Sequence, residues 1–178
     1  GLNAEIIKID NHTLLVSVVE REPFALWCGE KFLYVETLEN CWFIDNTGFI
    51  FERAPLFSHG VYFEVYGALE NTEQDEILRA VLPKERFNLA LSFIQKLQKE
   101  HISPLRVFIK PEGEYGIVIN SSEYNPHLHD VEILFKEGQD GDLLIKNLLA
   151  SLPVQFPIGS VAEKKLLFVT YRSAYYTN

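Results

Sequence analysis

Residues 83–120 read PKERFNLALSFIQKLQKEHISPLRVFIKPEGEYGIVIN, and a change of period within them decides the fold. Apolar side chains recur at helical spacing after Pro83, which suits a first helical turn. The charged side chains lie largely off this stripe, as is typical of a helix that packs on a sheet by one face. Ser103-Pro104 prevents the helix from continuing. Residues 105–110 and 115–120 are then predicted strands around a turn at 111–113.

The flanking sequence extends this pattern in both directions. Toward the N-terminus, short runs rich in aromatic and β-branched residues predict strands at 6–10, 12–21, 32–38, 41–45, 49–53 and 61–67. Toward the C-terminus we expect a strand at 131–136, a helix at 143–152 ended by Pro153 and Pro157, and a final strand at 165–172. This order predicts an α+β fold, with a mostly antiparallel β-sheet and two principal helices packed on one side. There is no regular βαβ alternation, which disfavours a nucleotide-binding doubly wound fold.

Composition narrows the class of protein. The chain has 178 residues, is 47% hydrophobic and has a formal net charge of −9, so we expect a packed core and no affinity for nucleic acid or an anionic bilayer. It contains no methionine, so we expect an incomplete translation product whose preceding part was cleaved or omitted. No stretch approaches the roughly 18 apolar residues of a membrane span.

Catalytic motifs are scarce in this sequence. It has no phosphate-binding loop, no dinucleotide fingerprint, no nucleophile elbow and no zincin helix. The best metal-like string is His127-Leu128-His129-Asp130, in which two imidazoles two residues apart would share a face if the segment were a strand. Because the string follows Asn125-Pro126 in a polar stretch, a solvated loop is the more ordinary interpretation. A small metal-dependent hydrolase using His127, His129 or Asp130 is therefore the most remote of the functional hypotheses.

Two cysteines, Cys28 and Cys41, each adjoin a tryptophan at the end of a predicted strand. A cross-strand disulfide would suit an oxidising compartment, whereas two small buried hydrophobic residues would suit the cytoplasm. The residues themselves leave both interpretations open. A metal site is disfavoured because CxxC spacing is absent.

Two strings of sequence carry a resemblance to a known family. Residues 14–27, LLVSVVEREPFALW, resemble the strand with a Glu-Arg-x-Pro-x-Ala-x-Trp ending of the FtsQ/DivIB bacterial cell-division proteins. Residues 41–51, CWFIDNTGFIF, are similar to that family's aromatic-x-Ile-Asp-x-x-Gly-x-x-Phe hairpin. Residues 167–172, LFVTYR, are more loosely similar to its Tyr-Ile-Asp-Leu-Arg strand, with Thr170 and Tyr171 replacing the Asp and Leu.

The resemblance implies a domain division and a location. Residues 1–26 would be the closing strands of a truncated POTRA-type domain, and residues 27–178 an FtsQ/DivIB-like β-domain. Members of the family are single-pass membrane proteins, so the chain would be an ectodomain at the extracytoplasmic face of the bacterial cell membrane. Its contact with the membrane would run only through a preceding helix. In that compartment the resemblance favours a Cys28–Cys41 disulfide.

The function that the resemblance implies is a non-enzymatic scaffold of the divisome, with no cofactor and no metal. Relatives recruit FtsB-like and FtsL-like single-pass partners, with the partner adding a strand at the C-terminal edge of the β-domain. An exposed edge strand and aromatic anchors suit this role, although the tyrosines could instead cover the last core layer. The partner-binding residues that we predict are Val169, Thr170, Tyr171, Arg172, Ser173, Ala174, Tyr175 and Tyr176.

Two further expectations stay open at this point. The family usually has a Gly or Asn turn after the Arg, and its absence here favours one long edge strand over residues 165–176. The alternative function is an extracytoplasmic POTRA-type adaptor in assembly or transport, which tandem POTRA repeats upstream would favour.

Overall fold

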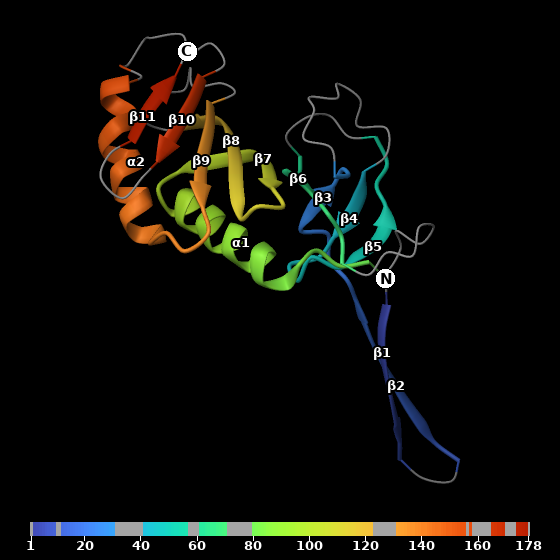
Figure 1. Cartoon of the computed structure of the whole chain (residues 1–178). Coiled ribbons are helices and arrows are strands. Elements are labelled where there is room, and N and C mark those ends of the chain that lie inside the picture. The colour runs from blue at the N-terminus through green and yellow to red at the C-terminus, as the bar shows by residue number, and fades with distance from the viewer. Residues whose placement is uncertain are drawn as a thin grey trace.

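The computed structural model describes residues 2–9, 12–30, 41–56, 61–70, 80–122, 131–155, 157, 165–169 and 174–177. The described elements form two separate sheets and two helices, and Figure 1 shows the smaller sheet projecting from the rest as a narrow ribbon. None of the helices within the described ranges is long and apolar enough to cross a membrane.

The projecting ribbon is an antiparallel hairpin of β1 (Leu2–Lys8) and β2 (Leu14–Glu20). Its register pairs Leu2 with Glu20 and Ile6 with Val16. The next strand, β3 (Ala25–Trp27), already belongs to the larger sheet. The change from one sheet to the other therefore lies between Glu20 and Ala25.

The larger sheet has nine strands in the order β11-β10-β9-β8-β7-β6-β3-β4-β5. Its pairs are antiparallel except β3–β6, β6–β7 and β9–β10, so the predicted, mostly antiparallel α+β fold is confirmed. The remaining strands are β4 (Trp42–Ile44), β5 (Ile50–Arg53), β6 (Glu64–Gly67), β7 (Ile102–Ile109), β8 (Glu114–Ser122), β9 (Val131–Lys136), β10 (Lys165–Val169) and β11 (Ala174–Thr177). The predicted strand at 32–38 lies outside the described residues.

Both helices cover the same face of this sheet. Helix α1 (Lys84–Lys99) buries one apolar face, while Leu91, which was predicted on the same stripe, is only partly buried. The buried residues of the helix are Phe87, Ala90, Phe93, Ile94 and Leu97. Helix α2 (Gly141–Gln155) contributes Leu144, Ile145, Leu148 and Leu152 to the same cluster. From Val107 onward, the strand residues in this cluster alternate along β7, β8 and β9, as expected for one face of a sheet: Val107, Ile109, Tyr115, Ile117, Ile119, Val131, Ile133 and Phe135.

Two predicted boundaries are wrong. Pro153 does not end α2 but lies inside its last turn, two residues before the helix ends at Gln155. Proline there removes one backbone donor from the last turn, a loss that the packing of the helix can offset. The chain end is also not one long strand, because β10 and β11 pair antiparallel, with Val169 opposite Ala174 and Leu166 opposite Thr177. The chain therefore reverses direction between Val169 and Ala174.

Candidate functional site

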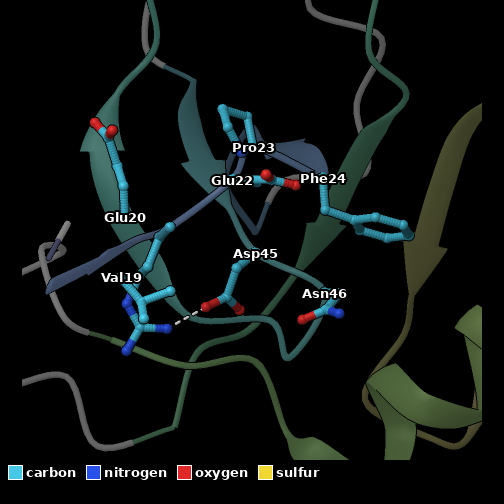
Figure 2. Close-up of a pocket in the computed structure, with 8 residues that line it drawn as sticks. Val19, Glu20, Glu22, Pro23, Phe24, Asp45 and Asn46 are labelled. Carbon is cyan, nitrogen blue, oxygen red and sulfur yellow. Dashed lines mark hydrogen bonds and ion pairs between the residues drawn. The ribbon is translucent and has the colours of Figure 1, made fainter. Parts of the chain in front are cut away.

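Two chain segments that are distant in sequence meet at the base of the projecting hairpin. Arg21, directly after β2, donates a hydrogen bond from Nη1 to Oδ2 of Asp45, in the turn between β4 and β5. Its guanidinium also lies 4.1 Å from the ring centroid of Phe49. Both partners belong to the second of the two sequence strings, so the ion pair joins the strings directly (Figure 2).

Asp45 also organises the β4–β5 turn. Its Oδ1 accepts hydrogen bonds from the backbone N–H of Thr47 at 2.9 Å, the hydroxyl of Thr47 at 2.5 Å and the backbone N–H of Phe49 at 3.1 Å. The residue is 6% exposed. Burial by itself would raise the pKa of this carboxyl, but the hydrogen bonds from Thr47, Phe49 and Arg21 outweigh it and hold the pKa below its ordinary value of 3.8. Asp45 is therefore a buried, charged carboxylate at neutral pH.

A pocket of about 300 Å³ opens beside this ion pair. Its walls come from the end of β2, the segment that leads into β3 and the β4–β5 turn (Figure 2). They consist of Val19, Glu20, Arg21, Glu22, Pro23, Phe24, Asp45 and Asn46. Because Arg21 already neutralises Asp45, the exposed carboxylates of Glu20 and Glu22 leave the pocket with an excess of negative charge.

The predicted partner-binding residues lie far from this pocket, at the opposite end of the nine-stranded sheet. Strand β11 is the last strand in the described order, and β10 is its one neighbour among the described strands. Val169 ends β10, and Ala174, Tyr175 and Tyr176 lie in β11. The other four predicted residues, Thr170, Tyr171, Arg172 and Ser173, lie outside the described residues.

The predicted disulfide is present. Cys28 follows β3 and Cys41 precedes β4, and since Trp27 pairs with Trp42 across these strands, the two sulfurs meet beside the end of the ladder. The Cα atoms are 4.3 Å apart. Cys41 is 4% exposed and packs with Leu26 and Phe43 on the face of the sheet away from the helices. The bond therefore ties together strands whose own pairing is only three residues long.

His127, His129 and Asp130 all lie outside the described residues. Among the residues that the structure does describe, no group of three or more His, Cys, Asp or Glu side chains could hold a metal ion. The metal-dependent hydrolase stays an untested hypothesis.

A second polar cluster, which the sequence did not reveal, lies on the face of the sheet away from the helices. Glu64 is 7% exposed and accepts a hydrogen bond from the hydroxyl of Tyr66 at 2.8 Å, while Nε of Arg106 lies 3.9 Å from the same carboxylate. Burial and the adjacent Glu64 carboxylate raise the pKa of Tyr66 well above its ordinary range. Glu64 and Arg106 are cross-strand neighbours on β6 and β7, a pairing that strand periodicity alone cannot identify.

The architecture is thus an α+β domain that ends in the short edge strand β11. A hairpin projects from this domain, and the Arg21–Asp45 ion pair lies where the hairpin meets it. No family model matches the chain, and no curated protein matches it.

Proposed function

We propose that this chain is the ectodomain of a non-enzymatic FtsQ/DivIB-like scaffold, which recruits FtsB-like and FtsL-like division proteins at the extracytoplasmic face of a bacterial membrane. The observation that carries the proposal is the position of β11 at the end of the nine-stranded sheet. An edge strand offers a row of unpaired N–H and C=O groups, to which an extended peptide can add.

The length of β11 sets how strongly a partner strand could bind through its backbone alone. In an antiparallel pair, alternate residues direct their backbone groups away from the existing neighbour. A four-residue strand therefore offers two residues, and about four hydrogen bonds, to an added strand. At about 1 kcal/mol net each, these bonds supply about 4 kcal/mol, which corresponds to roughly 1 mM before the entropy cost of association is subtracted. Side chains around β11 must supply the rest, and the predicted anchors are Tyr171, Tyr175 and Tyr176.

Two other observations support the proposal. The Cys28–Cys41 disulfide is compatible with an oxidising, extracytoplasmic location. The ion pair between Arg21 and Asp45 gives a physical role to one residue from each of the two strings that resemble the family. In this account the pair fixes the hairpin, which we propose is the end of a POTRA-type domain, against the β-domain.

A binding assay with two edge variants tests the proposal. The chain would be titrated with an FtsB-like ectodomain by calorimetry, as wild type and as Ala174→Pro and Tyr175→Lys. Ala174→Pro removes a backbone donor from β11, and Tyr175→Lys removes a predicted anchor. We expect each to weaken binding at least about tenfold, equivalent to 1.4 kcal/mol.

The control is Gln98→Lys, which adds the same charge at an exposed position on α1. Urea titrations of all variants establish that the fold persists. If Ala174→Pro proves to disrupt the terminal hairpin, Tyr175→Lys still decides the question. Wild-type affinity in a folded Tyr175→Lys variant, or an equal loss in Gln98→Lys, would refute the assignment of this edge.

A further inference from the structure

Another pocket, of about 230 Å³, is formed by α1, the end of β9 and the start of α2, and we call it the α1–α2 pocket. Figure 1 shows the start of α2 beside α1. The floor of the pocket is apolar, with the rings of Phe93 and Phe135 stacked at 4.3 Å between centroids and flanked by Leu89 and Leu144. Phe93, Phe135 and Leu144 are 3%, 4% and 1% exposed, so the pocket reaches the core. Because a cavity of about 150 Å³ holds a benzene molecule, this volume accommodates one ring with a short side arm.

The polar side chains that line the α1–α2 pocket present hydrogen-bond donors to it. Lys96 donates one of its three N–H groups to Asp142, and within the described residues the other two have no acceptor. Gln139 accepts a hydrogen bond from the backbone N–H of Lys136 at its Oε1, at 2.6 Å, so its amide N–H groups stay available as donors. The hydroxyl of Ser92 is also without a partner in the part of the chain that the structure describes. Since no described Asp or Glu lines the pocket, a ligand that fits it carries a hydrogen-bond acceptor.

Two acidic side chains lie just outside this lining, at the start of α2. Asp140 caps the helix, because its Oδ1 accepts hydrogen bonds from the backbone N–H groups of Asp142 and Leu143. Asp142 pairs with Lys96, but its side chain is 86% exposed, and an ion pair with so exposed a partner is broken at little cost. The ammonium of Lys96 also lies against the pocket lining, since its Nζ is 3.7 Å from a Cβ built on Gly141. Lys96 can therefore exchange Asp142 for an anion that enters the pocket.

We propose that the α1–α2 pocket binds a small aromatic carboxylate, with its ring on the floor of Phe93 and Phe135 and its carboxylate at Lys96. Burial of the ring supplies most of the affinity, and the charge-assisted hydrogen bond to the ammonium fixes the orientation. Ser92 and Gln139 offer further donors beside Lys96. A ring separated from its carboxylate by two carbon atoms matches this arrangement, as in 3-phenylpropionate.

The same skeleton has two sources, a free arylalkanoic acid and the C-terminal phenylalanine of a peptide. The lining of the pocket contains no residue of β11, where we propose that the division partner adds a strand. The proposal consequently stands or falls independently of that partner.

A matched pair of ligands tests the proposal on the full chain by two-dimensional NMR. The chain would be titrated with 3-phenylpropionate and with 3-phenylpropionamide, which keeps the ring and removes the charge. We expect the carboxylate to bind with a dissociation constant on the order of 1 mM, about fivefold more tightly than the amide. The backbone resonances that shift should belong to the segments that line the pocket, residues 89–96 and 139–144. Equal affinity for the two ligands, or shifts at β11 in place of these segments, would overturn the proposal.

Two charge variants separate the role of Lys96 from that of overall charge. Lys96→Gln should remove the preference for the carboxylate, whereas Lys99→Gln, at an exposed position on the same helix, should preserve it. Asp142→Asn removes the acid that competes for Lys96, so it should tighten carboxylate binding about threefold and leave amide binding unchanged. Glu100→Gln, which removes an exposed acid at the other end of α1, should have no such effect. Equal changes in Asp142→Asn and Glu100→Gln would contradict the competition.

A third ligand, N-acetylglycyl-phenylalanine, distinguishes the two sources of the carboxylate. Binding at least as tight as that of 3-phenylpropionate, with shifts in the same segments, supports the proposal with a peptide C-terminus as the ligand. Weaker binding supports it with a free acid as the ligand. Leu89→Trp, which fills the pocket and keeps the three donor side chains, should abolish binding of both. If urea titration shows that this variant is unfolded, Lys96→Gln still decides, because undiminished preference for the carboxylate in that variant would refute the site.

Discussion

Asp45 joins two segments of the chain that are distant in sequence. Its carboxylate receives hydrogen bonds from Thr47 and Phe49 within its own turn and from Arg21 across a gap of 24 residues. The carboxylate stabilises the fold only while all of its hydrogen-bond partners are present, because a buried carboxylate that loses a partner retains its desolvation cost. The Asp45 side chain is 9% exposed and the Arg21 side chain 29%, so the pair is only partly screened by water.

We predict that Asp45→Asn lowers the free energy of unfolding by about 2 kcal/mol at pH 7, because the amide keeps some turn hydrogen bonds but loses the ion pair. Urea denaturation measures the change. Asn46→Ala, at the exposed neighbouring position, should alter stability by less than about 0.5 kcal/mol. Equal effects of the two substitutions would contradict the central role of Asp45.

The same pair predicts a pH dependence. Because the pKa of Asp45 is lower in the folded state than its ordinary 3.8, the unfolded state binds more protons in this range and stability rises with pH. The contribution of the carboxylate is complete above its unfolded pKa and is lost as the pH falls through the folded pKa. The stability difference between wild type and Asp45→Asn should therefore shrink below about pH 4. A difference that stays constant down to pH 2 would show that the carboxylate charge is not involved.

At the scale of the elements, the β4–β5 turn requires a glycine for two reasons. Gly48 has a φ of +82°, and a Cβ built on it would lie 3.1 Å from Cδ1 of Phe87 and 3.2 Å from Cβ of Leu82. The turn is thereby pressed against the start of α1. Gly138 has nearly the same φ of +81° but no atom within 4 Å of a Cβ placed there. Alanine at Gly138 would therefore test the cost of the backbone conformation alone, whereas alanine at Gly48 would add the cost of packing.

Gly48→Ala and Gly138→Ala form a matched pair. Both should lose about 1 kcal/mol for an alanine in the left-handed region, and Gly48→Ala should lose about 1 kcal/mol more because Phe87 and Leu82 must move. Thermal and urea unfolding of both variants give the difference directly. Equal destabilisation would mean that the turn does not pack tightly on α1.

Elements with a strong local pattern were predictable from the sequence. The stripe of α1 and the strands of 105–110 and 115–120 follow from side-chain period and from Pro104, and these are local properties. The terminal hairpin was not predictable, because residues 170–173 contain no glycine or asparagine and the reversal shows only in the pairing of β10 with β11. The Arg21–Asp45 pair was missed for a related reason. Arg21 and Asp45 lie in the two segments that resemble the family, 14–27 and 41–51, but their contact depends on how the two sheets meet.

For the whole molecule, the disulfide links the strands at one end of the nine-stranded sheet. Cys28 and Cys41 are separated by 13 residues, and a closed loop of this size stabilises a fold by about 3 kcal/mol in the chain-entropy description. We predict that reductant lowers the free energy of unfolding by about this amount. The double variant Cys28→Ser/Cys41→Ser should be equally destabilised and insensitive to reductant. Detection of two reactive thiols in the untreated protein would contradict the bond.

The claim that β11 receives a partner strand is tested most directly by hydrogen–deuterium exchange of the full chain, with and without an FtsB-like ectodomain. Backbone pairing protects amides that were open to water. The account predicts slowed exchange at alternate residues of Ala174–Thr177, with the amides of β5 at the other edge of the sheet unchanged. Saturating ectodomain that leaves exchange in β11 unaltered, or that protects β5 instead, would contradict the account.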